Sequence, residues 1–422
     1  MGHLLTARVR SINEWTGHRR LPHSGYAATP ADRLVDSVGV NTHLWYDNSV
    51  YYNRYSDIIK PALIDMGIRH IRDGVRTGPG FGENGYFYTR VRELTAAGVR
   101  HTLTTSYNGA YSTETNWAQL PSVYQWCNGG IVAWTGVNEP DLYGPTGGGW
   151  PAATTAAQQN LWNVIQADAT QVAAGVQVVS SSPTGSGPTT LGDQSPWCDV
   201  VDYHPYEGGR RPGQQVSSGL TQARAMGATE PVVWTECGYH HHLPATGHIP
   251  VSLLADGIYT PRMFLEYFRR GVYRSFSYEL MDLWSSAGQD ARFGWISNGG
   301  TPYLAYTATK NLLTVMADPG PAFTPAPLPH RVEGFAAAHT RSLLFGKRDG
   351  SHWLAIWRDV DVWNRTTKTD INVAAQPVTV DLAQPRQWST FRPTTAATVD
   401  DEGYGRHIDL QISGEAVLVK VA

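Results

Sequence analysis

Eight short apolar runs recur along the first two thirds of the chain, and they limit what it can fold into more than any other feature. Segments with helical spacing separate them, and most intervals between runs are close to thirty residues, the length of one strand–helix unit. The runs are SVGVN (37–41), GIRHIR (67–72), VRHTLTT (99–105), IVAWTGV (131–137), VQVVSS (176–181), DVVDYH (199–204), PVVWTE (231–236) and YRSFSY (273–278). Eight such units predict an α/β fold, a (β/α)8 barrel, for which roughly 250 residues are typical.

A doubly wound open sheet is the alternative to the barrel. That fold usually has a Gly-rich phosphate turn after its first strand, and GVNTHLWY at this place has none. GPTGGGW (144–150) is rich in Gly but lacks the Lys-Ser/Thr of a phosphate-binding loop. The barrel is therefore favoured. Glycines follow several of the helical segments, among them Gly67 and Gly271, where a helix typically ends.

The character of the sequence changes after residue 318. PGPAFTPAPLP (319–329) is rich in Pro and predicts a stiff linker. Two alternating runs then meet at Asp349-Gly350, a strong hairpin signal, and QPVTVDL and GEAVLVKVA predict further strands. We therefore expect a (β/α)8 barrel over 36–318 and a β-sandwich over 330–422. Residues 1–35 form an arm, in which LLTARVRSI either adds a strand to the sandwich or is only partly ordered.

Charge and composition exclude several classes of partner. The net charge of −3 offers no basic surplus for nucleic acid or an anionic membrane, and no run approaches the roughly 20 apolar residues of a bilayer span. Three cysteines, Cys127, Cys198 and Cys237, allow one disulfide at most. The segment MGHLLTARVR lacks the apolar core of a signal peptide, so the protein is either cytoplasmic or secreted with its signal already removed.

Two glutamates occupy equivalent places in this pattern. Glu139 lies just past the fourth predicted strand, and Glu236 ends the seventh. The loops after the strands form the concave face of such a barrel, and strands four and seven face each other across it, so the two side chains converge. Either they are ion pairs of Arg72 and Arg274 at the barrel mouth, or they act together. Two carboxyl groups about 5 to 5.5 Å apart suit glycoside hydrolysis with retention.

The residues around these glutamates resemble a known family. VNEP at strand four and WTECG at strand seven resemble the acid/base and nucleophile motifs of the clan A glycoside hydrolases, which are retaining (β/α)8 enzymes. The arrangement is most similar to family 39, whose barrels often carry a β-sandwich. The resemblance implies that Glu139 is the general acid/base and Glu236 the nucleophile. It also implies that Asn138 holds the 2-hydroxyl of the sugar.

Residues at other strand ends extend this resemblance. YHPYEGG closes strand six, where His204 and Tyr206 would flank the nucleophile and contact the substrate, and Tyr206 would orient Glu236 by a hydrogen bond. The alternative for Tyr206 is a simple wall residue. RHIRDG closes strand two, where Arg72 would lower the pKa of the nucleophile because a nearby cation favours the charged carboxylate. Asp73 is an alternative, purely structural partner for Arg72.

Tryptophans supply candidate platforms for sugar rings. Trp284, beyond strand eight, stands where the clan places the aromatic floor of its site. Trp45, after strand one, and Trp295 are further candidates. Glu279 and Glu207 also lie near strand ends and compete for the catalytic assignment.

Three adjacent histidines, 240–242, suggest a metal site at first sight. Alternate side chains of an extended segment face opposite ways, so the three cannot all reach one ion. We expect no metal and no cofactor, and instead expect His240 or His242 to contact sugar hydroxyls from the loop after strand seven.

Together these features predict a retaining glycoside hydrolase. The resemblance implies, as its substrate partner, an oligosaccharide or polysaccharide of plant cell walls or microbes, made of neutral sugars such as xylose, arabinose or galactose. That activity favours a secreted protein. A transglycosidase with the same residues and a non-catalytic carbohydrate-binding barrel are the alternatives. The sequence does not set the oligomeric state.

Overall fold

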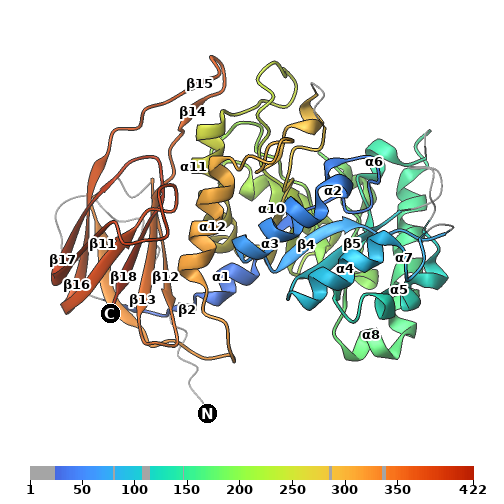
Figure 1. Ribbon diagram of the computed structural model, residues 1–422, viewed down its shortest axis with the longest axis horizontal. Coiled ribbons are helices and arrows are strands. Elements are labelled where there is room, and N and C mark those ends of the chain that lie inside the picture. The colour runs from blue at the N-terminus through green and yellow to red at the C-terminus, as the bar shows by residue number, and fades with distance from the viewer. Residues whose placement is uncertain (1–23, 79–80, 107–114, 146, 285–287, 335–338) are drawn as a thin grey trace, which may run out of the picture.

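The structure of the 422-residue chain is a computed structural model. It describes residues 24–78, 81–106, 115–145, 147–284, 288–334 and 339–422. Figure 1 shows a barrel on one side and a body of strands on the other, with helices α11 (Leu253–Arg269) and α12 (Leu304–Met316) between them.

Eight parallel strands form the barrel, in the order β7-β6-β5-β4-β3-β10-β9-β8. A parallel bridge between Val179 and Val200 joins the two ends of this order, so the sheet closes on itself. Each predicted apolar run overlaps one strand, and the prediction of a (β/α)8 barrel is confirmed. The strands are β3 (Val38–Asn41), β4 (His70–Gly74), β5 (Arg100–Thr105), β6 (Ile131–Val137), β7 (Gln177–Val179), β8 (Val201–Asp202), β9 (Val232–Cys237) and β10 (Arg274–Ser277).

Helices surround this sheet (Figure 1). Gly67 and Gly271 follow two of them with φ of +69° and +80°, the left-handed conformation expected just past a helix end. Besides α11 and α12, the helices are α1 (Asp32–Asp36), α2 (Val50–Asn53), α3 (Lys60–Met66), α4 (Tyr86–Ala96), α5 (Leu120–Trp126), α6 (Pro140–Tyr143), α7 (Trp150–Ala167), α8 (Ala169–Ala173), α9 (Gly187–Leu191) and α10 (Val216–Met226). A π-helical turn, Tyr55–Ile59, leads into α3.

Small and apolar side chains fill the inside of the barrel. Ala133, Val179, Val200, Val233 and Phe276 form a buried cluster there. Gly39 lets the strands come close, because a Cβ at this position would lie 2.4 Å from the Phe276 ring. The interior is therefore a packed core below the open end of the barrel, and not a pore.

The C-terminal part is a mostly antiparallel sheet of eight strands that wraps around its own core. Its strands are β11 (Leu328–Glu333), β12 (Thr340–Gly346), β13 (His352–Arg358), β16 (Gln376–Phe391), β17 (Asp401–Ile412) and β18 (Val417–Val421), with β1 (Ser24–Tyr26) and β2 (Thr29–Pro30) added from the N-terminal side. β12 and β13 pair as the hairpin predicted at Asp349-Gly350. β16 shifts register between Asp381 and Arg386, and it pairs with β11 before this shift and β18 after it. The result is a β-sandwich-like domain.

Alternating side chains of β13 join the two parts of the molecule. Leu354 and Ile356 face the core of the C-terminal sheet, whereas Trp353 and Trp357 join the hydrophobic core that includes the barrel helices. From the barrel side, Arg262 on α11 donates 2.8 and 3.0 Å hydrogen bonds to backbone carbonyls of the C-terminal domain. The two domains therefore share a buried interface.

The division of the chain into domains stays a prediction. β1 pairs with β11, so a segment before residue 35 does join the C-terminal sheet, whereas LLTARVRSI lies outside the described residues. β11 begins at Leu328, inside the predicted linker. Cys127, Cys198 and Cys237 are free thiols. Among the described residues, no helix has the length and apolar character that crossing a bilayer requires.

Candidate active site

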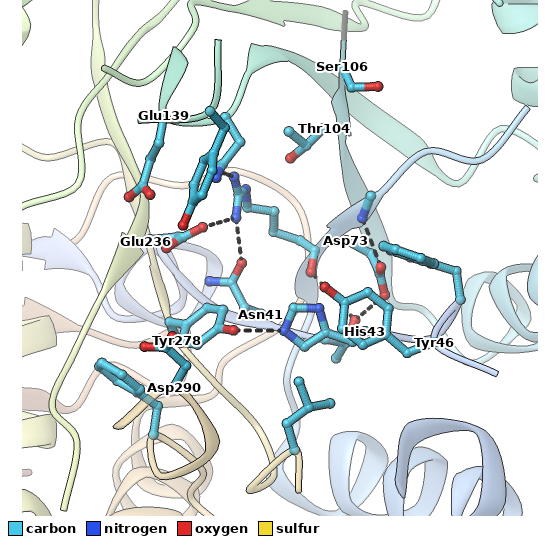
Figure 2. A pocket seen from close by; sticks show the side chains of 18 of the residues that line it. Asn41, His43, Tyr46, Asp73, Thr104, Ser106, Glu139, Glu236, Tyr278 and Asp290 are labelled. Atoms are coloured by element: carbon cyan, nitrogen blue, oxygen red, sulfur yellow. Dashed lines mark hydrogen bonds and ion pairs between the residues drawn. The ribbon is translucent and has the colours of Figure 1, made fainter. Parts of the chain in front are cut away.

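A cavity of about 610 Å³ opens at the carboxyl end of the barrel strands. Residues from the ends of β3, β4, β5, β6, β9 and β10 and from the loops after them line it. Seven of the nine predicted site residues are among the lining: Glu139, Glu236, Asn138, Tyr206, Arg72, Trp45 and Trp284. Figure 2 shows the Glu139 and Glu236 carboxyl groups next to each other on one side of this cavity, with His43, Tyr46 and Asp73 on the other.

The two glutamates meet as the sequence predicted. One carboxylate oxygen of Glu139, one of Glu236 and a ring nitrogen of His204 all lie within 4.8 Å of one another. Glu236 is the last residue but one of β9 and is 8% exposed, and Glu139 lies between β6 and Pro140, the first residue of α6. Glu139 has a φ of +42°, a left-handed conformation that costs a non-glycine residue about 1 kcal/mol or more. Strain of this kind is typical of residues that a site holds in place.

Glu236 is held from both sides. Arg72 Nη1 donates to its Oε1 at 2.6 Å, and Tyr206 Oη donates to its Oε2 at 2.6 Å. Burial alone would raise the pKa of Glu236, but the charges of His204 and Arg72 and the hydrogen bond from Tyr206 lower it to about 2. Glu236 is therefore a carboxylate at neutral pH, and the ion pair with Arg72 predicted as an alternative exists within the site.

Arg72 also fixes two asparagines. Its Nη1 donates to Oδ1 of Asn41 at 3.0 Å, and its Nη2 donates to Oδ1 of Asn138 at 2.6 Å. With its oxygen on Arg72, Asn138 keeps its amide N–H groups for another partner, and the residue lines the cavity. Asp73 is not the partner of Arg72. It accepts instead from Thr42 Oγ1 and Leu44 N, both at 2.8 Å.

His204 does not line the cavity, which corrects its predicted role as a substrate contact. It lies behind the two glutamates, with Nδ1 3.0 Å from Glu139 Oε1 and 3.7 Å from Glu236 Oε2. Burial lowers the pKa of His204, but Glu236, Glu139 and Asp202 together raise it above its usual value. Nδ1 of His204 thus faces Glu139, and its Nε2 lies 3.1 Å from Thr235 Oγ1.

Among the described residues, the same three side chains are grouped closely enough to act as ligands of a metal ion. Glu139, His204 and Glu236 present three donor atoms close together. When His204 carries both of its protons it has no free lone pair for a metal, so the rise in its pKa disfavours that use. The adjacent histidines 240–242 do not gather around one point either, because His240 contacts the carbonyl of His248 and His241 lies 3.2 Å from Asp282.

Two of the three predicted tryptophan platforms lie at the cavity. Trp45 and Trp284 line it, and the Arg76 guanidinium lies 3.9 Å from the centre of the Trp45 ring. Trp295 is a correction, because it is 1% exposed and packs edge-on against Phe264 inside the core. Its position in the sequence did not show that its side chain points away from the barrel mouth.

Sequence reasoning missed a further group of residues in the wall of the cavity. His43, Tyr278 and Phe293 line the cavity, and His43 Nε2 lies 3.1 Å from Tyr278 Oη and 3.3 Å from Glu279 Oε2. His43 and Tyr278 follow or end barrel strands, so the rule that found the glutamates applied to them as well. Glu279 itself is buried beneath this wall and is not exposed to the cavity.

One further expectation is corrected, and one of the competing glutamates lies outside the cavity lining. Neither His240 nor His242 lines the cavity; the histidine of that loop that does so is His248. Glu207 is fully buried and accepts from Tyr267 Oη at 3.1 Å, and burial raises its pKa to about 8. It is therefore a structural residue next to the site.

Comparisons with known proteins agree with the barrel. The sequence matches no family model and no curated protein. A family 39 glycoside hydrolase from the gut symbiont Bacteroides cellulosilyticus WH2 superposes with a TM-score of 0.61 at 13% identity, over 93% of this chain and 81% of that chain. A family 51 α-L-arabinofuranosidase from Bifidobacterium longum gives 0.55 at 12% identity, over 94% and 97%. An endo-β1,6-glucanase gives 0.52 at 12% identity, over 95% and 93%. At the level of fold, these structures confirm the resemblance to glycoside hydrolase barrels, family 39 among them.

Proposed function

We propose that the protein is a retaining glycoside hydrolase. The observation that carries the proposal is the pair formed by Glu139 and Glu236, whose carboxylate oxygens approach to within 4.8 Å. Retaining enzymes place their two carboxyl groups about 5 to 5.5 Å apart, whereas inverting enzymes keep about 6.5 to 9.5 Å for a water molecule. The fold likeness to glycoside hydrolases supports the same conclusion.

In the first step, a carboxylate oxygen of Glu236 attacks the anomeric carbon. The bond from that carbon to the leaving oxygen breaks, and the proton of Glu139 goes to that oxygen. In the second step, Glu139 takes a proton from water while the water oxygen attacks the same carbon. The bond to Glu236 breaks and both carboxyl groups return to their starting states. The low pKa of Glu236 suits the nucleophile, because it is ionised before substrate binds.

The neighbours of the pair take supporting roles in this proposal. Asn138 offers its amide N–H groups to the sugar 2-hydroxyl, and Tyr206 and Arg72 hold Glu236 in place. Trp45 and Trp284 offer apolar faces for sugar rings. Both arginines of the cavity lining are engaged with protein groups, Arg72 with Glu236 and Arg76 with the Trp45 ring, which favours neutral sugars over uronic acids.

Substitution of the pair tests this assignment. Glu236→Ala should abolish turnover while the protein stays folded, and wild-type activity of this variant would refute the nucleophile. Glu139→Ala should be slow on natural substrates, and azide should restore its activity on an activated aryl glycoside. A panel of aryl glycosides and plant and microbial polysaccharides would identify the sugar; we propose xylosides, arabinosides and galactosides first, and a secreted enzyme that meets them outside the cell.

Two alternatives use the same geometry. A transglycosidase would pass the sugar to another sugar, so mass spectrometry of products at high acceptor concentration separates it from a hydrolase. A carbohydrate-binding barrel would bind oligosaccharides and release no product over days.

A further inference from the structure

One part of the C-terminal domain leaves its sheet and reaches the barrel. Residues 359–373 follow β13 and form a separate two-stranded hairpin of β14 (Trp363–Asn364) and β15 (Thr369–Asp370). Figure 1 shows this hairpin at the top of the view, where it extends away from the C-terminal sheet. We call residues 359–373 the clamp hairpin.

The clamp hairpin holds the loop that follows β9. Lys368, at its turn, donates from Nζ to the carbonyls of Leu243 and Ala245 at 2.6 and 2.8 Å. Asp370 accepts a hydrogen bond from Ser252, the residue that caps α11. One cation thus ties together two carbonyls of an otherwise irregular loop, and the end of that loop is fixed as well.

The same hairpin holds the loop that follows β8. Arg365 Nε donates to the carbonyl of Gly208 at 2.8 Å. Arg211 of this loop in turn forms ion pairs with two carboxylates of the hairpin, Asp359 Oδ1 at 2.9 Å and Asp361 Oδ2 at 3.1 Å. The hairpin therefore links two barrel loops that lie far apart in sequence from it.

These two loops carry residues of the candidate active site. The β8 loop carries Tyr206, which hydrogen-bonds Glu236, and the β9 loop carries His248, which lines the cavity. The rings of Tyr206 and His248 meet edge to face, with centroids 5.5 Å apart. The backbone at Gly208 also lies against His248, since a Cβ there would be 3.4 Å from its ring. Movement of either loop would therefore shift Tyr206 relative to the nucleophile.

We propose that the clamp hairpin positions Tyr206 and His248 for catalysis, with Lys368 and Arg365 as its positioning residues. The C-terminal domain is then a working part of the active site and not a separate accessory module. The predicted effect on kcat rests on the proposed function. The predicted effect on the stability of the two loops does not.

The test compares Lys368→Met, Arg365→Met and a control, Arg386→Ala. Arg386 is exposed on β16, where it pairs with Gly405 of β17, and it takes no part in the clamp contacts described above. Hydrogen exchange followed by mass spectrometry should show amides of 238–252 exchanging about tenfold faster in Lys368→Met, since loss of a clamp lowers the local opening energy. Exchange in the control should be as slow as in the wild type. Lys368→Arg, which keeps the cation, should also exchange slowly.

Kinetics on the best aryl glycoside provide the second measurement. Lys368→Met and Arg365→Met should each lower kcat by about five- to tenfold while KM changes by less than about twofold, because orientation of the nucleophile matters in the transition state. Unchanged exchange in Lys368→Met would overturn the clamp. Faster exchange with unchanged kcat would overturn its role in catalysis. An inactive wild type with the exchange result intact would overturn the proposed function and leave the clamp standing.

Discussion

Replacing Tyr206 with Phe removes one hydrogen bond and leaves the ring contacts in place. The bond from Tyr206 Oη to Glu236 Oε2 is 2.6 Å long and its acceptor is charged. Hydrogen bonds to charged groups contribute about 1.5–3 kcal/mol, and 1.36 kcal/mol corresponds to about one pKa unit. We therefore expect the pKa of Glu236 to rise from about 2 by about one to two units. If the same energy is lost in the transition state, kcat/KM falls about ten- to hundredfold.

The assay is the pH dependence of kcat/KM for wild type and Tyr206→Phe. Because Glu236 must be ionised, activity falls as pH drops through its pKa, so the acid limb of the variant should lie at higher pH. Stability follows the same sign: the ionised Glu236 stabilises the fold above its usual pKa of 4.5, and this contribution is lost as pH falls towards 2. Tyr203→Phe is the control, because the hydrogen bond that its hydroxyl makes within the described residues is a long one, 3.4 Å to the carbonyl of Gly185. An unchanged acid limb and unchanged kcat/KM in Tyr206→Phe would refute the reasoning.

Three further predictions concern stability and binding. Glu207 keeps its proton up to a pH of about 8 when the protein is folded, so the free energy of unfolding should fall by up to about 5 kcal/mol as pH rises from 4.5 to 8. Urea unfolding at several pH values measures this fall, which should be much smaller in Glu207→Gln. Arg72→Met leaves the buried Glu236 carboxylate without its nearest cation, 2.6 Å away, and should lower the free energy of unfolding by about 3–5 kcal/mol at pH 7; a loss no larger than that of the control Arg386→Ala would contradict this. Trp284→Ala should raise KM with little change in Tm, whereas Trp295→Ala should cost about 3–5 kcal/mol of stability and leave KM unchanged.

The barrel and its proposed catalytic pair were accessible from the sequence because both follow from local patterns. Each strand is a short apolar run, and the end of a barrel strand faces the open mouth whatever the loops do. Counting the predicted strands was enough to place Glu139 and Glu236 at the open end of the barrel. The same rule would have found His43 and Tyr278, which also follow or end barrel strands and line the cavity.

Other features depend on packing that no local pattern shows. His204 and Tyr206 are two residues apart after the same strand, yet His204 is buried behind the glutamates and only Tyr206 reaches the cavity. Trp295 is a residue type that often forms a platform for sugar rings, but its side chain is buried in the core. The contact of Lys368 with the β9 loop spans more than a hundred residues, 125 to Leu243, and it exists only because the two domains pack together.

The stereochemistry of the first product tests the central claim most directly. Proton NMR of the reaction in its first minutes, on an aryl glycoside that the enzyme cleaves, shows which anomer of the free sugar forms before mutarotation. With carboxylate oxygens of Glu139 and Glu236 within 4.8 Å, two successive displacements should release the sugar with the anomeric configuration of the substrate. Release of the opposite anomer would mean that water attacks directly, and would contradict a covalent role for Glu236.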